Sequence, residues 1–234
     1  MEPKKPSDIQ KKILLSLMHN PLMNFNKLWN REGRSNKFAY HLKILEKKGF
    51  VEKRKGQGYK LTLEGMKRVS YIESDNGENS QFPIMAVVVL IAKENKYLMI
   101  HRTKEPFHGY WGLPGGKLRA NNYILEQAKE SVKKETGLSC DLELKGLFSS
   151  KTYVNRMLAY NHQLFVVKAV NPKGTLIEKT RKGGNKWIKK GEVDKLRILP
   201  NIPLLVKIAN GKKFSWIQAD RIQKDGSIKI EMKD

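Results

Sequence analysis

A glycine-rich segment placed between two strand patterns and a helix pattern constrains the fold of this chain more than any other feature. It reads Tyr-Trp-Gly-Leu-Pro-Gly-Gly-Lys at residues 110–117. Upstream, the apolar run at residues 84–92 predicts a buried strand, and residues 97–101 predict its hairpin partner. Downstream, a helical pattern begins near Tyr123 and ends at Gly137. The order therefore predicts a sheet whose glycine loop leads directly into a helix.

A polar segment at residues 73–81 divides the chain into two parts. It contains no apolar residue and is rich in turn-forming residues, a composition typical of linkers. We therefore expect one domain at residues 1–72 and a second at residues 82–210. Residues 211–234 follow as a C-terminal extension, in which a Lys-Asp-Gly turn signal at residues 224–226 predicts an additional hairpin of unassigned role.

The charge of the chain is strongly one-sided. It has 46 Lys and Arg residues against 23 Asp and Glu residues, a net charge of +23. Such an excess favours polyanionic partners, above all nucleic acid. A high lysine content can also be common to all proteins of an organism. Because no apolar run approaches the ~18 residues that cross a bilayer, we expect neither a membrane span nor a cleaved leader. The single cysteine, Cys140, cannot form an internal disulfide, which fits a cytoplasmic protein.

The first domain alternates helix patterns with one short hairpin pattern. Ser7, Asn24, Ser35 and Thr62 each stand before a helical stretch, where a polar residue is expected as the N-cap. Two short strand patterns enclose a Gly-Gln-Gly turn at residues 56–58. The sequence thus predicts three helices, a hairpin and a fourth helix.

This order resembles the winged helix-turn-helix domain of bacterial and archaeal transcription regulators. The resemblance covers about residues 6–72. It rests on His-Leu-Lys-Ile-Leu-Glu-Lys-Lys-Gly-Phe-Val at residues 41–51 and Tyr-Lys-Leu-Thr-Leu-Glu-Gly at residues 59–65. It implies a mainly α DNA-binding domain whose third helix lies in the major groove and whose hairpin contacts the neighbouring backbone.

The third helix pattern has a polar, cationic face. If Phe38, Leu42 and Leu45 face the core, the polar residues between them point the other way at about 100° per residue. Asparagine can read a base edge, and lysines mostly hold phosphates. An ordinary solvated face of a docking domain is the alternative, and a lone histidine is more often structural than a reader of bases. The candidate DNA contacts are Asn36, Lys37, Tyr40, His41, Lys43 and Lys47 in this helix, and Arg54 and Lys55 at the hairpin tip.

The second domain resembles the Nudix family. The family box reads G-x5-E-x7-R-E-U-x-E-E-x-G-U, where U is aliphatic, and its spacing fits when Gly116 opens it and Gly137 closes it. A central strand pattern at residues 163–170 and a late tryptophan strand at residues 187–193 fit as well. The resemblance implies an α/β/α sandwich with a mixed sheet. It also implies that the domain binds nucleoside diphosphates linked to another group and hydrolyses them with Mg²⁺.

The metal-binding positions of this box are altered. In the box register, the first glutamate is Asn122, the arginine is Glu130, and the family's three Mg²⁺-holding positions are Ser131, Lys134 and Glu135. The formal charges of these three side chains cancel, and a lysine at such a site repels Mg²⁺ by about 1–4 kcal/mol. We therefore expect no catalytic residue and no assured cofactor. Glu135 binds Mg²⁺ only if the altered site still holds a metal.

Two other arrangements remain open. Glu126 and Glu130 can form a shifted metal site, although a Glu130–Lys134 pair at i, i+4 favours a structural role for Glu130. In the second arrangement, Lys134 replaces the cation and binds a substrate phosphate directly. Glu135 lies near the apolar stripe of the helix and needs a partner, which is either a metal, a backbone N–H of the glycine loop, or Lys134.

The glycine loop remains suited to phosphate binding. Glycines let backbone donors approach a phosphate closely, a lysine next to them adds charge, and an arginine ending the upstream hairpin can clamp a second phosphate. The candidate nucleotide-binding residues are Arg102, Gly115, Gly116, Lys117 and Lys134.

Together these features predict a DNA-binding transcription regulator whose weakened Nudix domain binds a nucleotide or nucleotide-sugar ligand. A Nudix hydrolase of the nucleotide-diphosphatase type, with an altered metal site and a nucleic-acid-binding N-terminal domain, is the alternative. A scaffold that uses both domains for protein contacts is a third. Regulators of this type usually read a two-fold operator as dimers, so a homodimer belongs to the first hypothesis, although the sequence itself does not show dimerisation.

Overall fold

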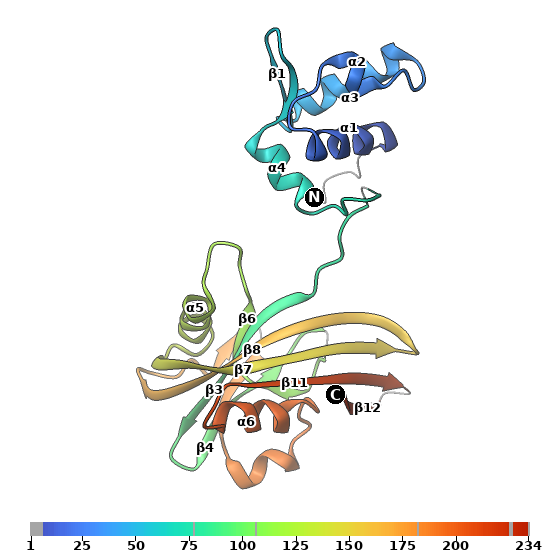
Figure 1. Ribbon diagram of the computed structural model, residues 1–234. Helices are drawn as coiled ribbons and strands as arrows, with labels where there is room; N and C mark the ends of the chain where they lie inside the picture. The colour runs from blue at the N-terminus through green and yellow to red at the C-terminus, as the bar shows by residue number, and fades with distance from the viewer. Residues whose placement is uncertain (1–6, 77, 106, 182, 225–226, 234) are drawn as a thin grey trace. The chain divides into compact units, whose positions relative to one another are not determined.

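Two units make up the fold, and the chain passes from one to the other after Gln81 (Figure 1). They are Met1–Gln81, the N-terminal unit, and Phe82–Asp234, the C-terminal unit. The computed structural model describes residues 7–76, 78–105, 107–181, 183–224 and 227–233. Among these residues, no helix is long and apolar enough to cross a membrane.

The N-terminal unit contains four helices and a two-stranded hairpin. Three helices begin at polar caps: the Ser7 and Asn24 side chains accept hydrogen bonds from the backbone N–H groups of Gln10 and Lys27, and Thr62 accepts from Gly65. The elements are α1 (Asp8–His19), α2 (Phe25–Trp29), α3 (Ser35–Lys47), β1 (Val51–Arg54), β2 (Gly58–Leu61) and α4 (Leu63–Val69).

The predicted cap of α3 is wrong by one residue. The N-cap is Arg34, which makes no side-chain capping bond, and Ser35 is already the first helical residue. The helix ends at Lys47 with Lys48 as its C-cap, and Gly49 follows with φ 71°, a left-handed conformation that favours glycine. Packing of its apolar face therefore stabilises α3 more than its start does.

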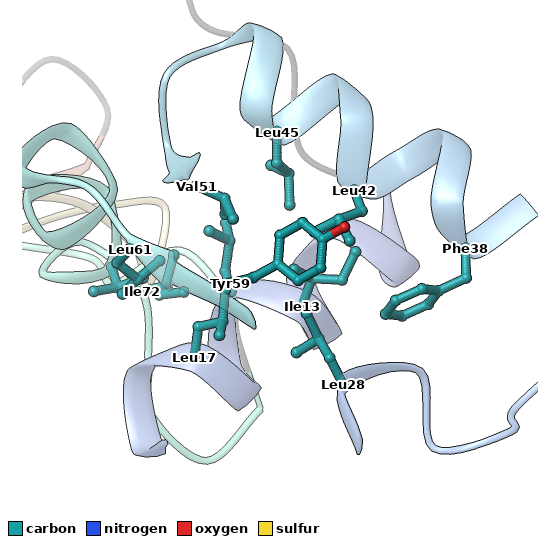
Figure 2. Packing of buried hydrophobic residues seen from close by; sticks show 12 residues of the cluster. Ile13, Leu17, Leu28, Phe38, Leu42, Leu45, Val51, Tyr59, Leu61 and Ile72 are labelled. Carbon is teal, nitrogen blue, oxygen red and sulfur yellow. The ribbon is translucent and has the colours of Figure 1, made fainter. Parts of the chain in front are cut away.

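The core of the N-terminal unit forms where α1, α3 and the hairpin meet. Figure 2 shows Ile13 and Leu17 of α1 packed with Leu42 of α3 and with Val51 and Tyr59 of the hairpin. The apolar residues of α3 recur at the i, i+4 and i+7 spacing that places them on one helix face. The opposite face of α3 is left to solvent.

The C-terminal unit is built on one mixed sheet. Its strand order is β12-β11-β7-β8-β3-β4-β10-β9, with β5 paired to β4 and β6 paired to β3. The β3–β8 and β11–β7 pairs are parallel, and the other pairs are antiparallel. The strands are β3 (Ile84–Lys93), β4 (Lys96–Arg102), β5 (Trp111–Gly112), β6 (Gly115–Lys117), β7 (Ser139–Val154), β8 (Met157–Lys173), β9 (Lys179–Thr180), β10 (Gly183–Lys189), β11 (Ser215–Lys224) and β12 (Ser227–Lys233).

Helices cover both faces of this sheet. They are α5 (Ile124–Thr136) and α6 (Ile202–Asn210), and a short 3-10 helix, η1 (Lys190–Lys195), follows β10. Val87 and Val89 of β3 pack with Val132 of α5, whereas Leu90 packs with Leu205 of α6. Successive residues of a strand point to opposite faces, so α5 and α6 lie on opposite sides of the sheet, as Figure 1 shows.

The bounds of α5 follow from two local interactions. At its start, the Glu126 carboxylate accepts a hydrogen bond from the backbone N–H of Tyr123 at 2.8 Å. At its end, Gly137 has φ 76°, and a Cβ there would lie 2.6 Å from the carbonyl oxygen of Thr175. Only glycine suits that position. The position of Gly137 therefore fixes where α5 ends and how far its end lies from the glycine loop along the chain.

The C-terminal extension belongs to the sheet of the C-terminal unit. β11 and β12 pair as an antiparallel hairpin down to Lys224 and Ser227, and residues 225–226 of the expected turn lie outside the described residues. β11 also pairs in parallel with β7, which places Arg221 beside Thr152. The extension therefore adds side chains to the face on which α6 packs.

Candidate nucleotide-binding site

A cavity of about 670 Å³ opens in the C-terminal unit. The glycine loop, α5, the loop after β4, and the strands β8 and β11 all contribute to its lining. Apolar residues such as Ala86 and Leu164 form part of the wall. Among the described lining residues, six are basic and three acidic, so the cavity suits an anionic ligand. The charged residues are Arg102, Lys104, Lys117, Arg119, Lys134 and Arg221, with Glu105, Glu130 and Glu135.

Glu135 lines this cavity and is only 4% exposed. Its Oε2 accepts a hydrogen bond from the backbone N–H of Gly115 at 3.3 Å, and its carbonyl oxygen accepts one from Asn185 Nδ2 at 2.5 Å. A Cβ on residue 115 would lie 2.2 Å from the carbonyl oxygen of Val87. Of the partners considered for Glu135, the structure shows a hydrogen bond from the glycine loop. Residue 115 must be a glycine because its backbone packs closely on β3.

The two other metal-binding positions carry no carboxylate. Ser131 is buried, and its hydroxyl accepts a hydrogen bond from Gln127 Nε2 at 3.2 Å. Lys134 is exposed and lines the cavity. In the part of the chain that the structure describes, no group of three His, Cys, Asp or Glu side chains converges to hold a metal ion. The set of Ser131, Lys134 and Glu135 does not fit the oxygen ligands that Mg²⁺ requires.

The carboxylates of a shifted metal site are engaged elsewhere. Glu126 holds the first turn of α5, as described above, and the Glu130 carboxylate pairs with Arg119 at 3.2 Å. The expected Glu130–Lys134 pair is therefore wrong: among the described residues, Glu130 pairs across to the loop and not along the helix. Both partners are more than half exposed, so this ion pair contributes little stability.

Gln127 connects the helix to the loop before it, a role that sequence reasoning missed. Its Oε1 accepts hydrogen bonds from the backbone N–H of Arg119 at 3.2 Å and from Asn122 Nδ2 at 3.4 Å. Asn122 stands where the family box has its first glutamate, and it donates to a neutral amide. The available sequence signal was a glutamine in the first half of the helix pattern, whose amide group needs hydrogen-bond partners wherever it is buried.

The predicted nucleotide-binding residues come together in the structure. Arg102, Gly115, Gly116, Lys117 and Lys134 all line the cavity, as does Glu135. Burial lowers the pKa of Arg102, and the nearby Glu105 carboxylate opposes this shift. The guanidinium stays charged, because an arginine pKa lies far above neutral pH.

The aromatic residues of the glycine loop have packing roles. The Trp111 ring lies 5.0 Å from the His101 ring and packs against the core under α6. The Tyr110 ring carries the Arg197 guanidinium at 4.3 Å. Among the described residues, the cavity lining includes neither ring. Packing explains both residues without base stacking.

Sequence reasoning also missed two further side chains of the cavity, Arg221 on β11 and His162 on β8. Arg221 is 3% exposed, and its Nη2 lies 3.2 Å from His162 Nδ1. Burial lowers the pKa of Arg221 to about 10. Burial, followed by the charges of Arg221 and Lys117, lowers the pKa of His162 to about 4. At neutral pH His162 is therefore uncharged and Arg221 is a cation.

The candidate DNA contacts of α3 lie on its exposed face. Asn36, Lys37, Tyr40, Lys43 and Lys47 are exposed, away from the buried stripe of the helix. They form a continuous polar and cationic surface along α3.

Two of the remaining three DNA candidates have local partners. His41 is half-buried, and its Nδ1 lies 3.3 Å from the hydroxyl of Ser7, so it stabilises the start of α1. Arg54 Nε pairs with the Glu52 carboxylate at 3.2 Å. Lys55 is exposed in the hairpin turn.

The fold and the cavity define a NUDIX domain. The sequence profile of the NUDIX domain family matches residues 82–212, more than half of the chain. The chain therefore belongs to this family, which confirms the resemblance of the second domain. The match includes the glycine loop and α5 and ends shortly after α6.

Two curated relatives match shorter stretches. An ADP-ribose pyrophosphatase from Methanocaldococcus jannaschii is 39% identical over 69 residues, 29% of this chain and 41% of the relative. The human 8-oxo-dGDP phosphatase NUDT18 is 30% identical over 59 residues, 25% of this chain and 18% of the relative. The chain thus spans less than half the length of either relative.

The fold also matches solved NUDIX structures. The MutT protein from Bacillus halodurans superposes with a TM-score of 0.54 at 23% identity, covering 64% of this chain and 97% of that protein. At this level of identity the likeness establishes the fold alone.

Proposed function

We propose that the protein is a DNA-binding transcription regulator whose NUDIX domain is a receptor for a nucleotide-diphosphate ligand. The observation that carries this proposal is the set of side chains on α5. Ser131 and Lys134 replace two carboxylates, and Glu135 is engaged by the glycine loop. A helix with this set of side chains attracts the anionic ligand itself rather than a divalent cation.

The size and charge of the cavity support a ligand with a diphosphate group. Its volume of about 670 Å³ falls in the range of small-molecule sites, about 300–1,000 Å³. Lys117 and Lys134 lie on two elements that face this space, and Arg102 adds a third cation. The relative from Methanocaldococcus jannaschii is named for ADP-ribose, so ADP-ribose is the first ligand to test.

The N-terminal unit supports the DNA-binding part of the proposal. Its order of three helices, a hairpin and a fourth helix agrees with the order expected of a winged helix-turn-helix domain. A further backbone pair between Met23 and Tyr59, with hydrogen bonds of 3.0 and 2.7 Å, places a third extended segment beside the hairpin. In this proposal α3 enters the major groove, and Arg54 and Lys55 contact the adjacent phosphates.

A thermal-shift screen of the full chain tests the receptor. ADP-ribose, other nucleoside diphosphates and nucleoside triphosphates are added with EDTA or with Mg²⁺. A ligand at 100 times its Kd stabilises the folded chain by about 2.7 kcal/mol, which raises Tm by several degrees. The proposal expects this rise in EDTA as well as in Mg²⁺. No rise with any nucleotide would favour the scaffold hypothesis.

A NUDIX hydrolase with an altered metal site is the second candidate function. The 39% identity to a protein named ADP-ribose pyrophosphatase favours it. It predicts turnover of ADP-ribose at about 1 s⁻¹ or faster, a common rate for enzymes. It also predicts that Glu135→Gln abolishes this turnover, whereas a receptor shows no turnover to lose.

A further inference from the structure

A buried arginine lines the cavity apart from the α5 side chains. Arg221 of β11 is 3% exposed, and arginine is almost never buried to this extent without a partner. In the described part of the chain it has no carboxylate partner. Its Nη2 lies 3.2 Å from the His162 imidazole, and its Cζ lies 5.3 Å from the Phe107 ring. The described residues thus bury a cation without giving it a carboxylate counter-ion.

Polar atoms next to this arginine also lack partners. Among the described residues, Arg221 Nε, Ser150 Oγ and Thr152 Oγ1 are buried without a hydrogen bond. Strand register places Thr152 beside Arg221, and Ser150 beside His162, so the three atoms belong to one patch. Leaving buried polar groups unpaired costs stability, and of these three residues it is Arg221 that lines the cavity, where a polar partner can reach its guanidinium.

The surroundings select the charge of that partner. Burial and two cations, Arg221 of β11 and Lys117 of β6, keep His162 neutral at neutral pH, with its pKa lowered to about 4. A neutral imidazole that accepts from Arg221 through one nitrogen has an N–H to donate through the other. Two cations and an imidazole donor around one part of the cavity therefore favour a polar group with negative charge. A phosphate, with up to two charges and several acceptor oxygens, matches this set better than a carboxylate.

We propose that Arg221, together with His162 and Lys117, binds one phosphate group of the cavity's ligand directly, without a bridging metal ion. The identity of that ligand rests on the proposed function, whereas the phosphate site itself does not. The arginine fork makes two parallel hydrogen bonds to a phosphate, and the Phe107 ring covers the guanidinium. In this protein a buried arginine supplies the neutralising charge that the family obtains from Mg²⁺.

Calorimetric titration of the full chain with ADP-ribose in EDTA tests the arginine. Arg221→Met is expected to weaken binding by about 10- to 100-fold, the usual effect of removing a hydrogen-bonded charge. Arg221→Lys keeps the charge but loses the two-bond geometry, so it falls between Arg221→Met and the wild type. Arg181→Met is the matched control: Arg181 is exposed in the turn between β9 and β10 and does not line the cavity. It is expected to leave the affinity unchanged.

A second measurement uses the wild-type chain and inorganic phosphate, and so does not depend on whether the Arg221 variants fold. The imidazole of His162 is followed by NMR during a pH titration, with His162→Gln identifying its signals. A phosphate bound beside it partly cancels the two nearby cations, so the pKa of His162 rises from about 4. An unchanged titration curve would mean that phosphate does not bind there.

The two measurements separate the phosphate site from the regulator. ADP-ribose binding that is insensitive to Arg221, together with no response of His162 to phosphate, overturns the phosphate site and leaves the receptor standing. A phosphate response at His162 in a chain that binds no nucleotide supports the phosphate site and overturns the proposed ligand.

Discussion

At the scale of single residues, the charge at position 134 decides which ligand group α5 can face. Lys134 is exposed on the wall of the cavity, one residue before the buried Glu135. A lysine there attracts phosphate and repels Mg²⁺, and a glutamate would do the reverse. The neighbouring Ser131 offers only a hydroxyl, which Gln127 already engages.

Lys134→Glu is therefore expected to weaken metal-free ADP-ribose binding by about tenfold, because it replaces an attraction with a repulsion worth ~1.4 kcal/mol or more. Lys129→Glu makes the same charge change at an exposed position of α5 that does not line the cavity. Its affinity should stay near the wild-type value. Calorimetric titration in EDTA measures both variants, and equal losses would show that only the net charge of the domain matters.

His162 makes stability depend on pH. Its pKa is lowered to about 4 in the folded chain, so between pH 6.5 and pH 4 the unfolded chain binds a proton that the folded chain does not. The free energy of unfolding therefore falls as the pH drops through this window. His162→Gln is expected to reduce that loss, measured by urea denaturation at pH 7 and pH 5. A variant that loses stability in parallel with the wild type would contradict the assignment.

At the scale of elements, the β1–β2 hairpin depends on one glycine. Gly58 has φ 130°, and a Cβ there would lie 2.3 Å from the carbonyl oxygen of Met23. Gly58→Ala is expected to destabilise the chain by about 1–3 kcal/mol, because it combines backbone strain with a clash. Gly56 has φ 73° and open space around it, so Gly56→Asn should cost much less. Thermal melts compare the two, and similar losses would count against the clash.

The elements also show what the sequence can predict. The length of α5 was predictable because Gly137 must adopt a left-handed conformation and cannot carry a side chain. The cap of α3 was not, since Ser35 satisfies the local cap preference while the chain begins the helix one residue earlier. Arg221 and His162 were missed because they meet only through the parallel pairing of β11 with β7, which local patterns do not reveal.

At the scale of the whole molecule, the net charge of +23 is shared by two surfaces that suit different anionic partners. In the N-terminal unit, exposed lysines of α3 and the hairpin tip face solvent, where a phosphate backbone can reach them. In the C-terminal unit, six of the basic side chains line a cavity. A regulator needs both a DNA-binding surface and a ligand cavity. If it reads a two-fold operator, it binds as a homodimer, and sedimentation of the DNA complex tests this.

Charge reversal at the hairpin tip tests the DNA interface. Arg54→Glu with Lys55→Glu is expected to weaken binding of the full chain to duplexes of any sequence and to reduce the salt slope by about 2. The control, Lys212→Glu with Lys213→Glu, makes the same charge change at exposed residues of the C-terminal unit. Fluorescence anisotropy across a salt series measures both. Equal weakening by the two pairs would refute a specific role for the tip.

If α5 no longer binds a divalent ion, hydrolysis of ADP-ribose by the full chain does not depend on metal, and a turnover assay with and without metal measures that dependence. We expect Mg²⁺ and Mn²⁺ to leave the rate at the level of the metal-free control, while ADP-ribose still binds in EDTA. Metal-dependent turnover near 1 s⁻¹ that disappears in Glu135→Gln would contradict this expectation.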